Sequence, residues 1–420
     1  MELCKIKRPF GENVVYFLKW TLISFLLGGV CGTVGGFFSN CVAWVTAFRQ
    51  GHDWTLYLMP AVGVLIVWLY HVCREDKNKG TDTVLEAIAG QGSVTAATGP
   101  LIFIATVLTH FVGGSSGREG AALQLGGSMG SVAGRLLRLD EKDKRIAVMC
   151  GMSAVFAALF GTPAAAAIFP LEVASVGLLY HGALIPCMFS AYLGAGIARL
   201  MGAEGEHFTV MDMPGYSLAG AARVVILAIL CALVSIGFCE LLHGSHKLYG
   251  RYLKNPYIRI LAASAVFIGL TLVSGTRDYN GGSMQLIERA MEGQVRGQDF
   301  LLKALFTAVA LGAGFKGGEI VPTLCVGATF GCAAGHVLGL SPSLCAACGM
   351  AALFAGVTNC PVSTLLIAIE MFGGEGLPFY ALAVAVAFAM SGRYSLYGSQ
   401  RTVVERLKIG QSMLYIKNEK

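Results

Sequence analysis

The sequence predicts an all-helical protein that crosses the membrane several times. Of its 420 residues, 55% are hydrophobic and only 13% are charged, and the mean hydropathy is +0.65. This composition is unlike that of a soluble domain and is typical of a polytopic membrane protein. Glycine is common, with 55 residues. We therefore expect one transmembrane domain over 1–420, built partly from broken and tilted helices.

Six apolar runs are long enough to cross the roughly 30 Å hydrocarbon core of a bilayer as helices. They cover about 14–48, 55–73, 96–113, 182–201, 218–243 and 258–274. Several other apolar stretches between 119 and 390 are shorter and contain glycine or proline, which predicts interrupted helices. Backbone groups freed by such interruptions must be satisfied by protein or by a water-filled cavity, because lipid offers no hydrogen bonds.

Basic residues indicate the orientation of the chain. They cluster at 5–8, before the first apolar run, and again at 74–79, 251–259 and 401–420. The first run shows no signal-peptide cleavage pattern. By the positive-inside rule these clusters face the cytoplasm, so we expect both termini there, with 401–420 as a cytoplasmic tail. The net charge of +6 is explained in this way and needs no nucleic acid.

The two halves of the sequence contain a repeat. Four glycines recur 201 residues later: Gly117, Gly126, Gly130 and Gly134 correspond to Gly318, Gly327, Gly331 and Gly335. A second block recurs 198 residues later: Gly151-Met152, Phe156, Pro163 and Glu172 correspond to Gly349-Met350, Phe354, Pro361 and Glu370. The offset changes in a connection, where RLDEKDKR (138–145) faces the shorter GLSPS (339–343).

This shared register favours a duplication. Glycines spaced four apart would by themselves indicate only closely packed helices. Duplicated membrane halves commonly form inverted repeats, with the binding site near the midplane where broken helices of the two halves meet. We expect such repeats over about 14–200 and 218–400.

Two glycine-flanked glutamates occupy corresponding parts of the repeats. Glu119 lies in Gly-Arg-Glu-Gly (117–120), and Glu319 lies in Gly-Gly-Glu-Ile-Val-Pro (317–322). An ionisable group at membrane depth is costly and indicates a substrate or proton route. Helices that start near Gly120 and Ile320 would direct their positive N-terminal ends at one small volume, which favours an anion.

These segments resemble those of the CLC family of chloride channels and proton-coupled anion exchangers, over nearly the whole chain. Residues 117–120 are similar to the family's G-[KR]-E-G-P segment, which carries an external gating glutamate, although Ala121 replaces the proline. Residues 318–322 are similar to its G-x-F-x-P segment, with Ile320 in place of phenylalanine and Glu319 before it.

Two further segments of the family have weaker counterparts. The G-S-G-I-P loop, whose serine helps to hold chloride, aligns with 80–84, where Thr81 keeps a hydroxyl. The pore-lining tyrosine of the final helix corresponds to Tyr397, with Tyr394 as the competing candidate. The internal proton-transfer glutamate of ordinary exchangers is missing, because the sequence after Glu172 continues with Val173.

Together these departures resemble the bacterial fluoride-exporting branch of the family. The resemblance implies a fluoride/proton antiporter in the bacterial inner membrane, working as a homodimer with one pore in each subunit. It implies no cofactor and no metal, and we expect no CBS domains. A chloride/proton exchanger and a passive fluoride or chloride channel of the same fold remain open.

Each candidate residue has a functional and a structural interpretation. Glu119 is expected to gate the pore and carry the proton. The structural alternative is that it is only a loop carboxylate at a helix start. Glu319 is expected either to carry a proton and hydrogen-bond fluoride or to relay the proton onward. The structural alternative is that its side chain caps the N-terminus of a helix. Thr81 and Tyr397, with backbone N–H groups of Gly120, Ile320 and Val321, would donate to fluoride.

The remaining polar residues are expected to have supporting roles. Thr81 could equally be a polar residue at the membrane boundary. Glu172 and Glu370 recur in register, which favours a structural role for both. Arg118 and Lys316 are expected to concentrate anions or to pair with carboxylates.

Other classes of protein fit less well. A membrane scaffold that transports nothing would have no use for paired broken helices. An enzyme is not expected, because the sequence contains no metal-ligand cluster, Ser-His-Asp set or nucleotide-binding loop. The cysteines lie mostly in apolar runs, where a reduced thiol behaves as a small hydrophobic group.

Overall fold

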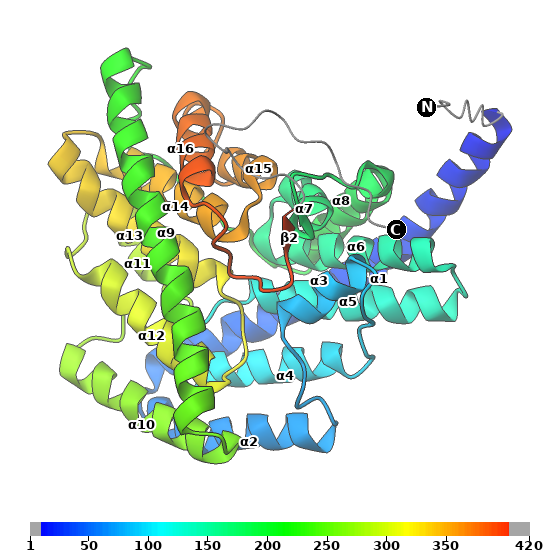
Figure 1. Cartoon of the computed structure of the whole chain (residues 1–420), viewed down its shortest axis with the longest axis horizontal. Helices are drawn as coiled ribbons and strands as arrows, with labels where there is room; N and C mark the ends of the chain where they lie inside the picture. The colour runs from blue at the N-terminus through cyan, green and yellow to red at the C-terminus, as the bar shows by residue number, and fades with distance from the viewer. Residues whose placement is uncertain (1–9, 403–420) are drawn as a thin grey trace, which may run out of the picture.

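The computed structural model describes residues 10–402, and this part of the chain is almost entirely helical (Figure 1). The helices of the first half are α1 (Phe10–Gly51), α2 (Met59–Val72), α3 (Thr81–Ile88), α4 (Thr98–Phe111), α5 (Glu119–Leu136), α6 (Glu141–Phe160), α7 (Pro163–Val173) and α8 (Leu184–Leu200). Those of the second half are α9 (Leu218–Tyr252), α10 (Pro256–Ser274), α11 (Met284–Met291), α12 (Asp299–Ala313), α13 (Ile320–Leu338), α14 (Pro342–Thr358), α15 (Pro361–Phe372) and α16 (Leu377–Met390). Short 3-10 helices cover Asp53–Leu58 and His181–Ala183.

Six helical segments within residues 10–402 are long and apolar enough to cross a membrane. They are Gly11–Gly51, Asp53–Val72, His181–Leu200, Leu218–Tyr252, Pro256–Ser274 and Ile320–Leu338. Five of them coincide with apolar runs predicted from the sequence. The apolar helices α4, α7, α14, α15 and α16 are shorter, as expected for a protein with partial spans.

The predicted spans differ from the structure at two places. The run at 96–113 forms only the 14-residue helix α4, because a loop precedes Thr98 and the glycine pair 113–114 follows soon after Phe111. Conversely, the glycines within Ile320–Leu338 do not interrupt α13. Pro322 lies in its first turn, where the missing N–H costs no helical hydrogen bond.

Corresponding helix pairs pack at glycines in both halves. A Cβ atom on Gly126 in α5 would collide with the carbonyl oxygen of Gly151 in α6. On Gly327 in α13 it would lie 2.5 Å from the carbonyl oxygen of Gly349 in α14. Small residues thus bring two backbones into contact in each pair. The repeated glycines of the sequence mark equivalent helix contacts.

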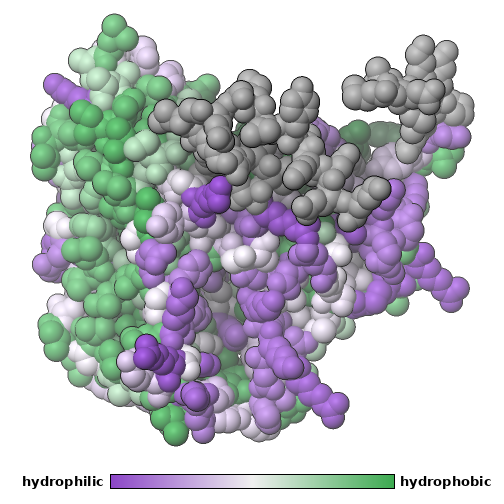
Figure 2. Space-filling model, viewed as in Figure 1, coloured by the Kyte–Doolittle hydropathy of each residue, from purple (hydrophilic) through white to green (hydrophobic). Residues whose placement is uncertain are grey.

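The long helix α9 presents an apolar surface. Leu230, Leu233 and Leu241 are exposed on it, whereas Cys231 and Ala232 between them are buried. Figure 2 shows hydrophobic residues gathered along the side of the molecule where α9 runs, and hydrophilic residues over the middle of the same view. This distribution fits a helix bundle whose flank contacts lipid.

The described chain ends against α7. Strand β2 (Arg401–Thr402) pairs in parallel with β1 (Ser175–Val176), and the Arg401 N–H donates to the carbonyl of Ala174. The predicted tail at 401–420 lies outside the described residues from 403 onward.

Candidate functional site

The two glycine-rich segments meet in the middle of the protein. Gly117 and Gly318 form an isolated antiparallel bridge, in which each N–H donates to the other's carbonyl at 2.7 Å. Helix α5 begins at Glu119 and α13 at Ile320, so both helices start within two residues of the bridge. First-turn N–H groups lack acceptors within their own helix and favour negative charge.

Glycine is required at this crossing. A Cβ atom on Gly318 would collide with the backbone nitrogen of Gly120, and one on Gly120 would lie 2.8 Å from the Cα of Gly318. The two helix starts are therefore pressed together with no side chain between them. Two positive helix ends consequently share one region of space.

Glu119 is fully buried at the start of α5. Its Oε2 accepts the backbone N–H of Arg118 at 3.0 Å, while its Oε1 has no hydrogen-bond partner among the described residues. The Arg118 Nε lies 3.5 Å from that Oε1. The carboxylate is thus held by few and rather long contacts.

Glu319 occupies the N-cap position of α13, but its side chain makes no capping hydrogen bond. Both Glu319 and Thr81 approach Gly120. A Cβ atom built on Gly120 would lie 3.4 Å from the Oε2 of Glu319 and 3.5 Å from the Oγ1 of Thr81. The structure therefore brings Glu319, Thr81 and Gly120 together.

Tyr397 joins this group, whereas Tyr394 does not. Tyr397 is buried, its hydroxyl has no hydrogen-bond partner within residues 10–402, and the next two residues, Gly398 and Ser399, donate to the side chain of Asp82 beside Thr81. The side chain of Tyr394 is 42% exposed. Of the two tyrosines considered from the sequence, Tyr397 is the one beside the candidate site.

Asp82 fixes the segment that carries Tyr397. Its carboxylate accepts the N–H groups of Gly398 at 3.2 Å and Ser399 at 3.0 Å, and the Ser399 hydroxyl at 2.6 Å. Asp82 lies in the first turn of α3, directly after Thr81. Asp82 thereby links the segments that carry Thr81 and Tyr397, the two side chains predicted to donate to fluoride.

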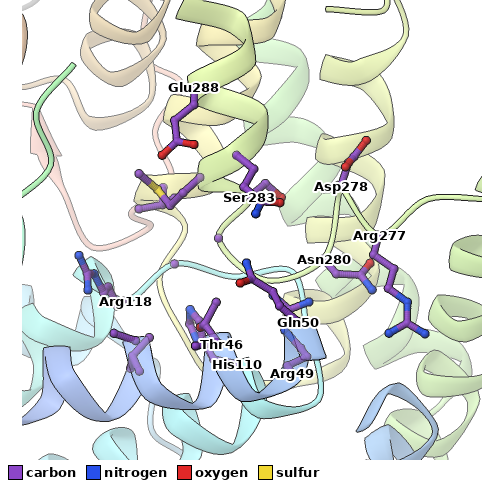
Figure 3. A pocket seen from close by; sticks show the side chains of 18 of the residues that line it. Thr46, Arg49, Gln50, His110, Arg118, Arg277, Asp278, Asn280, Ser283 and Glu288 are labelled. Atoms are coloured by element: carbon purple, nitrogen blue, oxygen red, sulfur yellow. The ribbon is translucent and has the colours of Figure 1, made fainter. Parts of the chain in front are cut away.

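A cavity of about 730 Å³ has Glu119 in its wall. Figure 3 shows this cavity from close by. Its wall comes from α1, α4, the segment 117–119, the segment between α8 and α9, the loop before α11, α11 itself and the start of α13. In Figure 3, Arg118 lies at one end of the cavity and Arg277 and Asp278 lie at the other. Ile320 is fully buried, and Val321 borders the cavity.

The two basic residues singled out in the sequence have different surroundings. Arg118 pairs with Glu119 and, more closely, with Glu206 at 2.6 Å. The Lys316 ammonium lies 4.4 Å from the ring centroid of Tyr70. Arg118 is therefore a carboxylate partner, and Lys316 a cation that stacks on an aromatic ring.

Comparison with known proteins identifies the family. The sequence model of the family described as voltage gated chloride channel matches residues 62–392. The chain belongs to the CLC family. The resemblance predicted from the motifs is confirmed, and so is the expectation that the protein is not an enzyme, since CLC proteins are ion channels and transporters.

Relatives of this CLC protein cover nearly its whole length. The chloride/fluoride channel protein of Pseudomonas syringae pv. tomato is 30% identical over 408 residues, covering 95% of this chain and 90% of the relative. The crystal structure of a CLC-type fluoride/proton antiporter superimposes with a TM-score of 0.88 at 29% identity, covering 92% and 98% of the two chains. A slow cyanobacterial Cl⁻/H⁺ antiporter shares the fold, with a TM-score of 0.77 at 18% identity and coverage of 89% and 94%.

The molecule is thus an all-helical, multi-span membrane protein of the CLC fold.

Two polar residues near the site of this CLC protein were not predicted from the sequence. Asp82 could have been suspected, because an acidic side chain follows the aligned Thr81 directly. Glu206 gave no signal, because Ala-Glu-Gly-Glu (203–206) reads as an ordinary polar connection.

Proposed function

We propose that this CLC protein exports fluoride in exchange for protons, with Glu119 as the coupling residue and Glu319 as a second pore carboxyl. The observation that carries the proposal is the convergence of Glu319 and Thr81 on Gly120, at the start of α5. A carboxyl at that position has no evident purpose in a chloride pore. Two similar proteins support fluoride as a substrate: a relative named as a chloride/fluoride channel protein, and a solved structure described as a CLC-type fluoride/proton antiporter.

The donors around this point suit fluoride. The ion is small and strongly hydrated, so a site must replace its water shell with several short hydrogen bonds. First-turn N–H groups at Gly120, Ile320 and Val321 are available by position, and the Tyr397 hydroxyl is buried without a partner. In this proposal Glu319 is protonated when fluoride binds, because two like charges at one site repel.

Glu119 couples the anion to the proton. As a carboxylate it is drawn to the same helix N-termini that attract fluoride, so it competes with the anion. Once protonated it loses this attraction and leaves the pathway, carrying the proton with it. The few contacts of its carboxylate leave it free to move.

The membrane potential and the proton gradient determine the direction of fluoride transport. An inside-negative potential drives an anion outward by about 2.3 kcal/mol per 100 mV. Coupling to inward proton movement adds the proton gradient to this force. In this proposal the protein works in the inner membrane of a bacterium, as a homodimer with one pore in each subunit and with both termini in the cytoplasm.

Efflux from liposomes tests the proposal. Purified protein is reconstituted into vesicles loaded with equal fluoride and chloride, and release is followed with ion-selective electrodes and a pH electrode. Fluoride release with proportional proton uptake is expected. Fluoride release without proton movement would show a passive fluoride channel, and comparable chloride release would show a chloride transporter.

A further inference from the structure

Arg118 is shared between two carboxylates. Its Nη2 lies 2.6 Å from the Oε1 of Glu206, and its Nε lies 3.5 Å from the Oε1 of Glu119. The guanidinium also donates to the Ser39 hydroxyl at 3.0 Å and to the Leu159 carbonyl at 3.4 Å. Arg118 is therefore fixed, with its shorter ion pair directed at Glu206 and its longer one at Glu119.

Glu206 is held in place by its backbone. It lies in the connection between α8 and α9, and its N–H donates to the carbonyl of Phe160 at 3.0 Å. Beside it, Gly205 packs against Gly161, so closely that a Cβ on Gly161 would lie 2.6 Å from the Cα of Gly205. The contact between Glu206 and Arg118 is consequently part of the packed protein and not a chance encounter of surface side chains.

All three members of this group border the same cavity. The side chains of Arg118 and Glu206 are 16% and 13% exposed, whereas that of Glu119 is completely buried behind them. The other charged or titratable groups on the cavity wall are Arg49, His110, Glu204, Asp278, Glu288 and the Arg277–Asp53 ion pair. Within residues 10–402 none of these forms a hydrogen bond or ion pair with Glu119 or Arg118, and Glu319 lies across the glycine bridge.

We infer that Glu206 is a positioning residue that keeps Arg118 from locking Glu119 in its charged form, and thereby sets the pH at which transport proceeds. A single arginine charge divided between two carboxylates stabilises each less than it would stabilise one. Glu206, with the closer contact, takes the larger share. Its own negative charge also opposes ionisation of Glu119.

The consequence is a bias toward proton uptake by Glu119. With Glu206 in place, the buried carboxylate accepts a proton from the cavity at moderate acidity and is released from the pathway. Without it, the full charge of Arg118 holds Glu119 ionised, and a higher proton concentration is needed. This inference rests on the proposed coupling role of Glu119 and adds the residue that tunes it.

The test compares Glu206→Gln with the matched control Glu204→Gln. Both glutamates lie on the same connection and on the same cavity wall, but only Glu206 contacts Arg118. The pH profile of anion flux in liposomes is expected to move toward acid by about one pH unit in Glu206→Gln, because an opposite charge nearby shifts a carboxyl by one unit or more. Glu204→Gln should keep the profile of the unmodified protein.

A double variant separates tuning from a structural effect. In a Glu119→Gln background, adding Glu206→Gln should leave the remaining pH dependence unchanged, because the group that it tunes is gone. An equal shift in that background would overturn the inference. The inference would also be overturned if Glu206→Gln kept an unshifted pH profile while still exchanging fluoride for protons. The proposed function would stand in that case.

Infrared spectroscopy gives a readout that does not depend on transport. The protonated-carboxyl band that disappears in Glu119→Gln reports Glu119 directly in the purified protein. Its titration midpoint should move toward acid in Glu206→Gln and not in Glu204→Gln. An unmoved midpoint would refute the inference, whereas a moved midpoint in a protein without proton-coupled flux would refute only the proposed function.

Discussion

Glu172 and Glu370 each cap the helix that carries the other. Glu172, in α7, accepts the N–H groups of Val362 at 3.0 Å and Ser363 at 2.8 Å at the start of α15. Glu370, in α15, accepts the N–H groups of Ala164 and Ala165 at the start of α7, at 3.0 and 2.9 Å. The carboxylates satisfy first-turn donors that have no other acceptor in their helix.

This reciprocity predicts a structural effect for either residue. Glu172→Gln and Glu370→Gln should each lower stability by about 1–2 kcal/mol, because an amide accepts these hydrogen bonds less strongly than a carboxylate. Thermal unfolding in detergent measures the loss, with the exposed Glu375→Gln as a control that should not change. Lost proton coupling at unchanged stability in Glu172→Gln would instead put Glu172 on a proton path.

Glu119→Gln should abolish proton coupling while anion flux continues. The amide is nearly the size of the protonated acid but cannot release a proton, so the pathway stays open and no proton is carried. Fluoride and pH electrodes on the same liposomes measure the ratio of the two ions. If the variant still drove protons against a gradient, the coupling role assigned to Glu119 would be wrong.

Glu319→Gln should slow fluoride transport. An amide has two fixed N–H donors and a carbonyl acceptor, and it cannot switch between donor and acceptor as a carboxyl group does when it gains or loses a proton. The measurement is initial fluoride efflux at several pH values, with the protein's folded fraction checked by size-exclusion chromatography. Unchanged flux with intact coupling would leave Glu319 with a purely structural place at the start of α13.

The sequence predicted the residues of the two glycine-rich segments better than it predicted the contacts that hold these segments in place. Gly117 and Gly318 stand out because each lies within two residues of a glutamate in otherwise apolar sequence, and their repeat register places them at equivalent points. The sequence predicted that the two helix starts converge, whereas the backbone bridge between Gly117 and Gly318 was not predicted. The CLC fold could be predicted for the same reason, since the motifs and the apolar runs agree.

The supporting contacts could not be predicted, because they join segments far apart in the chain. Glu206 meets Arg118 across 88 residues, and Asp82 meets Ser399 across 317 residues. Nothing in the local pattern at 203–206 distinguishes Glu206 from Glu204, and the place of Asp82 beside Thr81 does not indicate its partner at 399. The length of α4 was overestimated for a different reason: hydropathy counts apolar residues without regard to where a loop begins.

Asp82→Asn should loosen the segment that carries Tyr397. The loss of charge-assisted hydrogen bonds to Gly398 and Ser399 costs about 1–3 kcal/mol, which corresponds to roughly 5- to 150-fold in a local opening equilibrium. Hydrogen exchange at 396–400 should accelerate accordingly. Glu86→Gln, on the same helix α3 but paired with Lys79 at the surface, should leave this exchange unchanged, and equal acceleration in both variants would contradict the assigned contact.

Gly318→Ala should disable the pathway by separating the two helix starts. The added methyl group would collide with the Gly120 nitrogen and lie 2.9 Å from its Cα, so the bridge to Gly117 must open. Overpacking of this kind costs about 1–3 kcal/mol, and it moves the N–H donors that face the anion. Thermal unfolding and fluoride efflux measure the two effects.

The control for this variant is Gly282→Ala. Gly282 borders the cavity that contains Glu119 in its wall, but a Cβ on Gly282 would meet its nearest neighbour, Val321, at an ordinary 3.6 Å. It should therefore unfold and transport like the unmodified protein. Normal fluoride flux in Gly318→Ala would mean that the helix starts tolerate separation, and the anion would then have to be held by side chains such as Thr81 and Tyr397 more than by the N–H groups of α5 and α13.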